Sequence, residues 1–570
     1  MDVEFQAGRA AQLAGDAQTS SAIFAALVRQ NPRDPDLRYW LSSALMLLGD
    51  GEAAEQSLND ARTLQTLAAV AELDGDVARL KTDAAYANVI ASQLYERGFV
   101  ALASVVWGMA IAAGSMELAI LGNYALALQH QGRVDEASDI YRVAVQNFPG
   151  AGLHRFLVYA QLFCEDGEAR HAAEARTWAK LYAGAPAPTP HANPPLAGRK
   201  LRIGYLAPNF ASSQLRQFIT PVLESHDPAI VEVVLYPTDA ATETVWPSWV
   251  QVHPIGKLSD SDAAALIRRD RIDILNDCWG FTSGSRIGVF THRPAPVQAA
   301  WINFFQTTGL PQMDYVLHAD ADDAPDLGNL FHEELWGVAP AFTPFRPAPE
   351  RLPPAPTPAK ATGMVTFGSF NHPAKLSPGA IGAWAAILRN RPQSRLLLKY
   401  RYFADPVLQR ATRTVFAAHG VAPERLVFAG HTTGEDYFAA FQTVDLMLDA
   451  WPAPGSTTTL EALSNGVPVL AMVGDTPSLG GFYARTILRN VGLPDLITKT
   501  PEAYIQRALE VTEDLDALDS LRARVRPGFD NGPICDEVGF TRRLEQAYQG
   551  MFERWAGLSV PRLVAAMGSR

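Results

Sequence analysis

Four glycines divide the first 150 residues into related segments, and their spacing restricts the fold more than any other feature of the chain. Gly15 and Gly49 are 34 residues apart, and so are Gly98 and Gly132. Helical hairpins that repeat in this way cannot bury their apolar faces alone, so they stack on one another. Nine and twelve positions after each glycine stand two apolar residues, namely Phe24 and Leu27, Leu58 and Ala61, Trp107 and Ala110, and Tyr141 and Ala144.

The period, the glycine in the turn and a closing proline together match the tetratricopeptide pattern. Pro32 and Pro149 each follow a glycine by seventeen residues. An ordinary helical bundle is the alternative, and the two equal spacings favour the repeats. The interval between Gly49 and Gly98 is longer by 15 residues, so we expect the stack to be disturbed around residues 67–80. Such stacks bind a protein or peptide on a concave surface.

Beyond residue 200 the pattern changes to short apolar runs that alternate with helical segments, which predicts parallel doubly wound sheets. Two Pro-rich stretches interrupt the chain, with five prolines in residues 186–195 and seven in residues 344–358. Strands are expected at 201–206, 231–236, 272–276 and 297–302, and then at 365–370, 395–399, 425–428, 446–449 and 467–470; helices are expected at 260–269, 380–390 and 408–419.

The expected fold class is therefore a set of α-helical repeats followed by an α/β region of two doubly wound, Rossmann-like domains. We expect a cleft between the two α/β domains, with ligands at the carboxyl ends of the strands. The predicted boundaries are helical repeats at 1–185, a Pro-rich linker at 186–200, a first α/β domain at 201–345, a second linker at 346–362, and a second α/β domain with C-terminal helices at 363–570.

The charge balance and the cysteines exclude several classes of protein. The chain has 48 Lys and Arg against 60 Asp and Glu, a net charge of −12, which argues against nucleic acid and anionic membrane surfaces as partners. The longest uncharged apolar run, 99–113, is shorter than the ~18 residues of a spanning helix. The N-terminus shows no secretory pattern, and the three cysteines form no pair motif, which is typical of a reducing compartment. We expect a cytoplasmic protein.

Several common catalytic motifs are missing. The chain has no phosphate loop, no HExxH, no GxSxG and no GxGxxG after the first strand, which disfavours P-loop ATPases, zinc proteases, α/β-hydrolases and standard dinucleotide oxidoreductases. Asp320 and Asp322 form a DxD pair, but the polar residues around them favour a solvated loop over a metal site. No metal ligand is assigned.

One stretch that follows an expected strand has the chemistry of an anion site. Gly455, Ser456, Thr457 and Thr458 form a turn that opens a helix. The backbone N–H groups, the hydroxyls and the positive end of the helix dipole there suit a diphosphate. Glu461 lies one turn further on, where its carboxylate can accept hydrogen bonds from both ribose hydroxyls. The alternative is helix capping alone, with a Ser or Thr N-cap and an acidic residue near the helix start.

The surrounding sequence resembles the O-linked N-acetylglucosamine transferase family. The run from Leu448 to Leu463, followed by Asn465-Gly-Val-Pro-Val-Leu, resembles its donor-binding segment. The resemblance spans about residues 190–555, tetratricopeptide repeats precede the catalytic part in that family too, and we identify the chain as a bacterial member with a divergent donor pocket. Other motifs follow in the family's order at 201–210, at 293–301 with Thr307-Thr308-Gly309 and Met313-Asp314-Tyr315, at 369–376 and at 428–437.

The resemblance implies a GT-B fold, in which two facing doubly wound domains hold a nucleotide sugar, and inverting transfer without a metal. It implies that Lys375 is the cation that neutralises the leaving diphosphate, together with amides at a helix end; a surface lysine is the alternative. Thr432 and Tyr437 match the loop that holds the nucleobase. The donor-binding residues that the resemblance implies are His372, Thr432, Tyr437, Ser456, Thr457, Thr458 and Glu461.

The chain departs from the family at several of these positions. After the first strand it has Asn209 where the family has an acidic residue, and it lacks two histidines there; Ser456 and Tyr437 replace two more. A UDP-sugar is the first expectation, and another sugar or a CMP-linked nonulosonic acid fits a remodelled pocket. Arg216 is an added cation for a sugar carboxylate, with a surface ion pair as the alternative.

The acceptor side is expected to involve Asn209, Arg216, Thr307 and Thr308. His191 precedes the first catalytic strand, where the family has a histidine at the cleft. An imidazole with a pKa near 6.5 can take a proton from an acceptor hydroxyl. A linker histidine without a catalytic role is the alternative.

The leading hypothesis is a protein O-glycosyltransferase that moves a sugar from a nucleotide sugar to Ser or Thr of a protein client recruited by the repeats. On this hypothesis a chain without residues 1–150 keeps donor binding and loses protein modification. A second version serves one dedicated client such as flagellin. A non-catalytic repeat scaffold is the third hypothesis; Lys375 and Glu461 speak against it, and the lost family positions speak for it. No cofactor is expected besides the nucleotide sugar.

Overall fold

The computed structural model describes residues 2–72, 76–184, 191–212, 215–239, 246–319, 327, 330–474 and 478–557. The pair Asp320 and Asp322 lies outside these ranges. Contacts divide the chain into two compact units, each described here by itself. Unit 1 comprises Met1–Gly167, Pro349–Thr476 and Leu493–Pro527, and unit 2 comprises Glu168–Ala348, Pro477–Gly492 and Gly528–Arg570.

The predicted helical repeats form the first part of unit 1. Gly15, Gly49, Gly98 and Gly132 have φ values of +82°, +88°, +89° and +85°, and they follow the ends of α1, α3, α5 and α7. A residue with a β-carbon pays about 1–2 kcal/mol in this left-handed region, so glycine ends these helices. The helices are α1 (Asp2–Leu13), α2 (Ala17–Gln30), α3 (Pro35–Leu48), α4 (Gly51–Glu72), α5 (Ala84–Glu96), α6 (Val100–Ala112), α7 (Leu118–Gln129), α8 (Val134–Asn147) and α9 (Ala151–Ala160).

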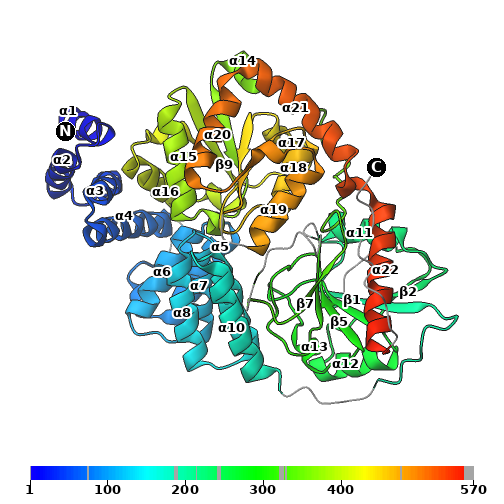
Figure 1. Ribbon diagram of the computed structural model, residues 1–570. Coiled ribbons are helices and arrows are strands. Elements are labelled where there is room, and N and C mark those ends of the chain that lie inside the picture. Colours follow the sequence, from blue (N-terminus) through cyan, green and yellow to red (C-terminus); the bar gives the residue numbers. More distant parts are fainter. Residues whose placement is uncertain are drawn as a thin grey trace. The chain divides into compact units, whose positions relative to one another are not determined.

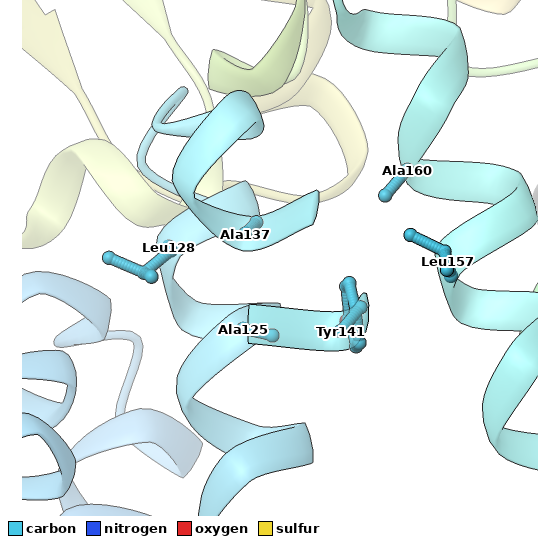
Figure 2. Packing of buried hydrophobic residues seen from close by; sticks show 6 residues of the cluster. All are labelled: Ala125, Leu128, Ala137, Tyr141, Leu157 and Ala160. Atoms are coloured by element: carbon cyan, nitrogen blue, oxygen red, sulfur yellow. The ribbon is translucent and has the colours of Figure 1, made fainter. Parts of the chain in front are cut away.

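The apolar positions that repeat after each glycine are buried, which confirms that they form the repeat core. Phe24 is 0% exposed, Leu58 6%, and Trp107 and Tyr141 1% each. Figure 2 shows Tyr141 of α8 beside small and branched residues of α7, α8 and α9, namely Ala125, Leu128, Ala137, Leu157 and Ala160. The longer interval before Gly98 is taken up partly by α4, which has 22 residues, and partly by a 3-10 turn, η1 (Arg79–Lys81).

The second part of unit 1 is a parallel sheet of six strands in the order β10-β9-β8-β11-β12-β13. The strands are β8 (Val365–Ser369), β9 (Ser394–Lys399), β10 (Leu426–Ala429), β11 (Leu446–Leu448), β12 (Val469–Met472) and β13 (Ile497–Thr498). The helices are α14 (Pro358–Thr362), α15 (Pro378–Asn390), α16 (Pro406–Ala418), α17 (Gly434–Phe441), α18 (Thr457–Ser464), α20 (Pro501–Glu513) and α21 (Leu515–Asp530), with 3-10 turns η4 (Pro373–Lys375) and η5 (Arg401–Ala404).

Unit 2 contains a parallel sheet of seven strands in the order β3-β2-β1-β4-β5-β6-β7. The strands are β1 (Leu201–Ala207), β2 (Val231–Pro237), β3 (Val250–Val252), β4 (Ile274–Asp277), β5 (Val297–Ala300), β6 (Tyr315–His318) and β7 (Glu334–Gly337). The helices are α10 (Gly167–Tyr182), α11 (Arg216–Ser225), α12 (Asp260–Arg269), α13 (Gly288–Thr291), α19 (Leu479–Asn490) and α22 (Glu537–Trp555).

Two helices from distant parts of the chain complete unit 2. The C-terminal helix α22 lies against the sheet (Figure 1), where Phe540 stacks on Trp301 at 6.0 Å and the Tyr548 hydroxyl donates to Asn276 Oδ1 over 2.9 Å. Helix α10, counted with the repeats in the sequence analysis, packs on the loop after β5. A β-carbon on Gly309 would lie 2.7 Å from the backbone of Ala175 in α10.

The strands expected from the sequence are all present, within about two residues at each end, and helix α12 has the predicted bounds. Strands β3, β6, β7 and β13 were not expected. Within the described ranges, no helix is both long and apolar enough to cross a membrane.

Candidate functional site

The winding of the unit 1 sheet reverses between β8 and β11, with β9 and β10 on one side and β12 and β13 on the other. Ligands of doubly wound sheets bind at the carboxyl ends of the strands at such a point. Asn371, which follows β8, donates from Nδ2 to Oδ1 of Asp449, which follows β11, over 3.2 Å. The two side chains are 5% and 2% exposed, so a buried polar pair joins the two strand ends.

Asp449 also organises the loop that follows it. Its Oδ1 accepts the backbone N–H of Ala450 over 2.9 Å and that of Gly455 over 2.7 Å. Burial raises the pKa of Asp449, while the Gly455 hydrogen bond and the positive charge of Lys375 oppose the shift. The carboxylate therefore holds the loop against the strand end and fixes the position of Gly455 at the start of α18.

The turn before α18 requires a glycine because other polar atoms surround it. A β-carbon on Gly455 would lie 2.4 Å from Thr459 Oγ1 and 2.9 Å from Asp449 Oδ1. Ser456 is the N-cap residue of α18, and the Thr458 hydroxyl donates to Asn371 Oδ1 over 3.2 Å. The predicted phosphate residues thus stand at a helix N-terminus that is fixed to both strand ends, a geometry that suits an anion.

Lys375 lies at the same place. It ends η4, and its Nζ donates to the carbonyl oxygen of Pro454 over 2.6 Å. Burial lowers the pKa of Lys375, and the negative charge of Asp449 opposes that shift. The structure therefore brings the predicted cation to the loop that leads into α18, within unit 1. His372 stands before η4, where its Nδ1 accepts the backbone N–H of Ala374 over 3.0 Å.

A second group of side chains lies further along the same sheet edge. The Tyr437 hydroxyl donates to Glu461 Oε2 over 2.6 Å. Lys399 ends β9, and its Nζ donates to Thr432 Oγ1 over 2.7 Å and to the Gly430 carbonyl over 2.9 Å. Its ammonium lies 5.7 Å from the centre of the Tyr437 ring. The predicted nucleobase and ribose residues are therefore brought together, with Lys399 added to them.

Burial controls the charges of this second group. It raises the pKa of Glu461 to about 7, although the Tyr437 hydrogen bond opposes the shift. It also lowers the pKa of Lys399. Glu461 is thus a carboxyl group whose ionisation changes near neutral pH, and Lys399, whose ammonium lies over the ring of the same Tyr437, has lost part of its hydration.

The predicted acceptor-side residues are all in unit 2. Asn209 follows β1, and its Oδ1 accepts the backbone N–H of Ala211 over 2.8 Å, so its side chain shapes the turn at the strand end. Arg216 begins α11 and is exposed. Asp277, at the carboxyl end of the neighbouring strand β4, accepts the backbone N–H groups of Trp279 and Gly280. Burial raises the pKa of Asp277 to about 6.

Thr307 and Thr308 are buried and bind a carboxylate that the sequence analysis did not identify. Both hydroxyls, and the backbone N–H of Thr308, donate to Glu333. The residues are 1%, 0% and 5% exposed. The carbonyl oxygen of Thr307 lies 2.9 Å from His171 Nε2 of α10. The two threonines therefore shape the loop after β5, and their part in acceptor binding stays a prediction.

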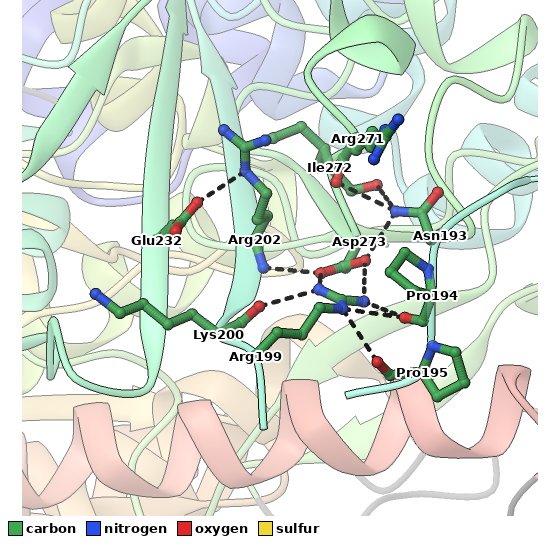
Figure 3. Close-up of polar contacts among 10 residues, drawn as sticks. All are labelled: Asn193, Pro194, Pro195, Arg199, Lys200, Arg202, Glu232, Arg271, Ile272 and Asp273. Atoms are coloured by element: carbon green, nitrogen blue, oxygen red, sulfur yellow. Dashed lines mark hydrogen bonds and ion pairs between the residues drawn. The ribbon is translucent and has the colours of Figure 1, made fainter. Parts of the chain in front are cut away.

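His191 lies at the opposite edge of the unit 2 sheet. Its ring meets Trp555 at 6.3 Å, and burial with the nearby charges of Arg268 and Arg293 lowers its pKa to about 4. Figure 3 shows the following segment, where Asn193 Nδ2 and Arg199 bind Asp273, just before β4. In a parallel sheet this is the amino-terminal edge, whereas ligands bind at the carboxyl edge. The structure does not bring His191 together with Asn209 or Thr307.

Sequence reasoning missed Asp449, Lys399 and Glu333. The first two stand at or directly after the end of an apolar strand run, and a charged residue at that point is the signal that was available. Glu333 had no such signal, because it precedes a short strand that was not predicted.

Helical repeats followed by two parallel doubly wound sheets define the fold class, a helical-repeat region joined to an α/β region of the GT-B type, and a lysine stands beside a helix N-terminus in the second part of unit 1. The chain belongs to glycosyl transferase family 41, whose model matches residues 168–342 and 358–543. The predicted fold class and the resemblance to O-linked N-acetylglucosamine transferases are thereby confirmed.

Individual proteins agree with this assignment. The chain is 35% identical over 397 residues to a probable UDP-N-acetylglucosamine–peptide N-acetylglucosaminyltransferase SPINDLY from Oryza sativa, covering 67% of this chain and 42% of that protein. It is 25% identical to the SEC protein of Arabidopsis thaliana, covering 63% and 37%. A solved O-GlcNAc transferase mutant from Thermobaculum terrenum superposes with a TM-score of 0.75 at 26% identity, covering 98% of both chains. The chain spans less than half the length of these two plant relatives.

Proposed function

We propose that the protein is an inverting, metal-independent protein O-glycosyltransferase that moves a sugar from a nucleotide sugar to Ser or Thr of a protein client. The observation that carries this proposal is the position of Lys375, whose Nζ is 2.6 Å from the Pro454 carbonyl in the loop that opens α18. A cation and a helix N-terminus at one point suit the two phosphates of such a donor.

The transfer step follows from that arrangement. The acceptor oxygen forms a bond to the anomeric carbon while the bond from that carbon to the phosphate oxygen breaks, and the electron pair goes to the departing diphosphate. Lys375 and the first amides of α18 meet charge that grows in the transition state, which is where stabilisation accelerates a reaction. The hydroxyl proton leaves to a base, for which His191 stays a candidate.

The donor that we propose first is a UDP-sugar. Glu461 supports a ribose, because its Oε2 already accepts the Tyr437 hydroxyl and its other oxygen can accept a further hydroxyl. Thr432 and Lys399 line the same group with polar atoms suited to a base edge. The names of the two plant relatives refer to UDP-N-acetylglucosamine, and Tyr437 and Ser456 are the positions at which another donor would be selected.

A binding panel tests the donor. Thermal unfolding is measured with UDP-, GDP- and CMP-sugars at equal concentration, because a ligand at 100 times its Kd stabilises the folded state by about 2.7 kcal/mol. UDP-N-acetylglucosamine should give the largest shift. A shift with a CMP-linked nonulosonic acid alone would overturn the UDP proposal and favour the flagellin version. Glu461→Gln is the matched variant, because it keeps the side-chain shape and removes the ionised carboxylate.

A transfer assay tests the chemistry. The donor that binds is incubated with a lysate of the source organism, and modified Ser or Thr residues are located by mass spectrometry. The anomeric configuration of the product should be opposite to that of the donor. Donor binding without transfer to any protein, by the intact chain and over long incubation, would favour the non-catalytic scaffold.

Metal independence is tested in the same assay. Transfer should persist in an excess of chelator, because Lys375 and the α18 amides take the charge that a divalent cation takes elsewhere. Loss of activity that Mn²⁺ restores would contradict the proposal and direct attention to Asp320 and Asp322. The cytoplasmic location and the recruitment of the client by the repeats stay proposals, the first supported by three cysteines that form no disulfide.

A further inference from the structure

The turn between α7 and α8 of the helical repeats, residues 130–133, packs directly on η4, the turn that ends at Lys375. Gly132 has a φ of +85°. A β-carbon on Gly132 would lie 2.9 Å from the carbonyl oxygen of Pro373, a backbone atom that a side-chain rotation cannot move. We refer to residues 130–133 as the repeat turn. The repeat turn therefore contacts the backbone of Pro373, two residues before Lys375.

His130 of the repeat turn makes the contact broader. Its ring stacks with Tyr402 at 4.5 Å and with Tyr95 at 5.7 Å, and it meets His372 edge-on at 5.0 Å. The Tyr95 hydroxyl lies 2.9 Å from His130 Nδ1. Tyr95 comes from α5, so two helices of the repeats hold the ring against the residues that flank η4.

Hydrogen bonds within η4 connect His372 to Lys375. Its Nδ1 accepts the Ala374 N–H over 3.0 Å, and its carbonyl oxygen accepts the Lys375 N–H over 2.9 Å. Its ring also meets Tyr400 at 4.9 Å. Burial lowers the pKa of His130 to about 3 and the pKa of His372 well below its usual range, and the charge of Arg401 acts on both rings in the same direction. Both rings are therefore neutral beside Lys375 at physiological pH.

We infer that the repeat turn sets the position of Lys375, with Gly132 and His130 as positioning residues for sugar transfer. The inference rests on the proposed role of Lys375. It gives the repeats a second task, because they then form part of the support of the donor site in addition to any surface for a client. A displacement of about 1 Å at a reacting group can cost on the order of 10²-fold in rate, so a small shift of η4 is sufficient.

Two glycine variants test the inference with a matched control. Gly132→Ala and Gly49→Ala introduce the same left-handed strain, since Gly49 has a φ of +88°, but an added β-carbon on Gly49 meets no atom within 4 Å. UDP release from UDP-N-acetylglucosamine is measured for both. We expect kcat to fall at least tenfold for Gly132→Ala, with the donor KM changed less than threefold, and to stay within twofold for Gly49→Ala.

A second measurement does not depend on the donor. Hydrogen exchange of the Ala374 and Lys375 amides should quicken at least tenfold in Gly132→Ala and stay unchanged in Gly49→Ala, because only the first substitution displaces Pro373. If Gly132→Ala does not fold, His130→Ala takes its place, and His130→Phe should restore kcat by restoring the stacked ring.

The outcomes separate the inference from the proposed function. If Lys375→Ala turns over normally, the proposed role of the lysine fails and the inference fails with it. If Lys375→Ala is inactive while Gly132→Ala matches Gly49→Ala in both kcat and amide exchange, the role of the lysine stands and the inference alone is overturned.

Discussion

At the scale of single residues, Lys375 is where we expect the largest effect on transfer. Its ammonium would meet charge that grows as the sugar–phosphate bond breaks, so Lys375→Ala should lower kcat by about 10²–10³ while donor affinity falls less. Turnover and donor Kd measured side by side check this. Lys360→Ala is the control, because Lys360 of α14 is a surface lysine that forms an ion pair with Asp516 of α21. Near-normal turnover in Lys375→Ala would remove the lysine from the mechanism.

For His191 we expect a smaller effect on kcat than for Lys375, because of its position in unit 2. Its ring lies with Trp555 and the charges of Arg268 and Arg293 at the amino-terminal edge of the sheet. A positioned general base is worth about 10²–10⁴ in rate, so a base at this position would show clearly. We expect His191→Ala to lose less than tenfold in kcat, and a loss of 10² or more would contradict this prediction and support His191 as the base.

Glu461 gives donor binding a pH dependence. Burial raises its pKa to about 7, so the group is protonated below that pH and then accepts ribose hydroxyls poorly. The affinity for UDP-N-acetylglucosamine should therefore fall as pH drops from 8 to 6, approaching tenfold per pH unit at the acid end. Calorimetry across this range checks it. Glu461→Gln should bind more weakly at pH 8 and show a flat profile, and a wild-type profile without slope would contradict the prediction.

At the scale of secondary-structure elements, the buried carboxylate of Asp405 caps two helices at once. Its Oδ1 accepts the N–H of Val407 at the start of α16, and its Oδ2 accepts the N–H of Ala101 at the start of α6 over 2.7 Å. Asparagine has one oxygen, so Asp405→Asn leaves one helix without its cap and should cost about 1–3 kcal/mol of unfolding free energy. Urea unfolding, with a lower midpoint at constant slope, measures this.

Asp34→Asn is the matched control for the capping prediction. Asp34 caps α3 through Oδ1 alone, which accepts the N–H groups of Asp36 and Leu37, and asparagine caps about as well as aspartate. Its unfolding free energy should therefore change little. Equal losses in the two variants would mean that the double cap at Asp405 adds nothing beyond an ordinary cap.

The elements also show what the sequence can and cannot predict. The 34-residue period located the repeat helices, because a left-handed glycine and a buried aromatic residue are local requirements that recur. Apolar runs located β1, β8 and β11, because burial of consecutive strand residues is also a local requirement. Strand β13 was missed because it has only two residues, and β7 was missed because its four residues are exposed or partly buried and include Glu334, so they form no apolar run. Packing between segments that are far apart in the sequence, such as that of His130 on His372, cannot be inferred from the spacing of residues along the chain.

At the scale of the whole molecule, the repeats and the six-stranded sheet belong to one compact unit. Tyr39, Leu58 and Ala61 of the repeats pack with Ala411 of α16 in one apolar cluster. Asp36 of α3 forms an ion pair with Arg410, which also belongs to α16. The spacing pattern predicted the repeats as a separable module for the client, whereas these contacts make them part of the packing that supports α16 and the six-stranded sheet.

A chain without residues 1–150 should therefore be less stable, in contrast to the expectation from sequence. The deletion removes the apolar partners of Ala411 and the α6 amides that bind Asp405, so α16 loses packing and apolar side chains become exposed to water. We expect it to unfold at lower temperature than the intact chain and to lose the thermal shift with UDP-N-acetylglucosamine. An intact chain with the exposed Met116 and Val143 changed to serine is the control, since it alters the repeat surface alone and should keep the shift. A shortened chain that binds the donor as the intact one does would show that the donor half folds without the repeats, and it would return the repeats to the role of a separable client-binding module.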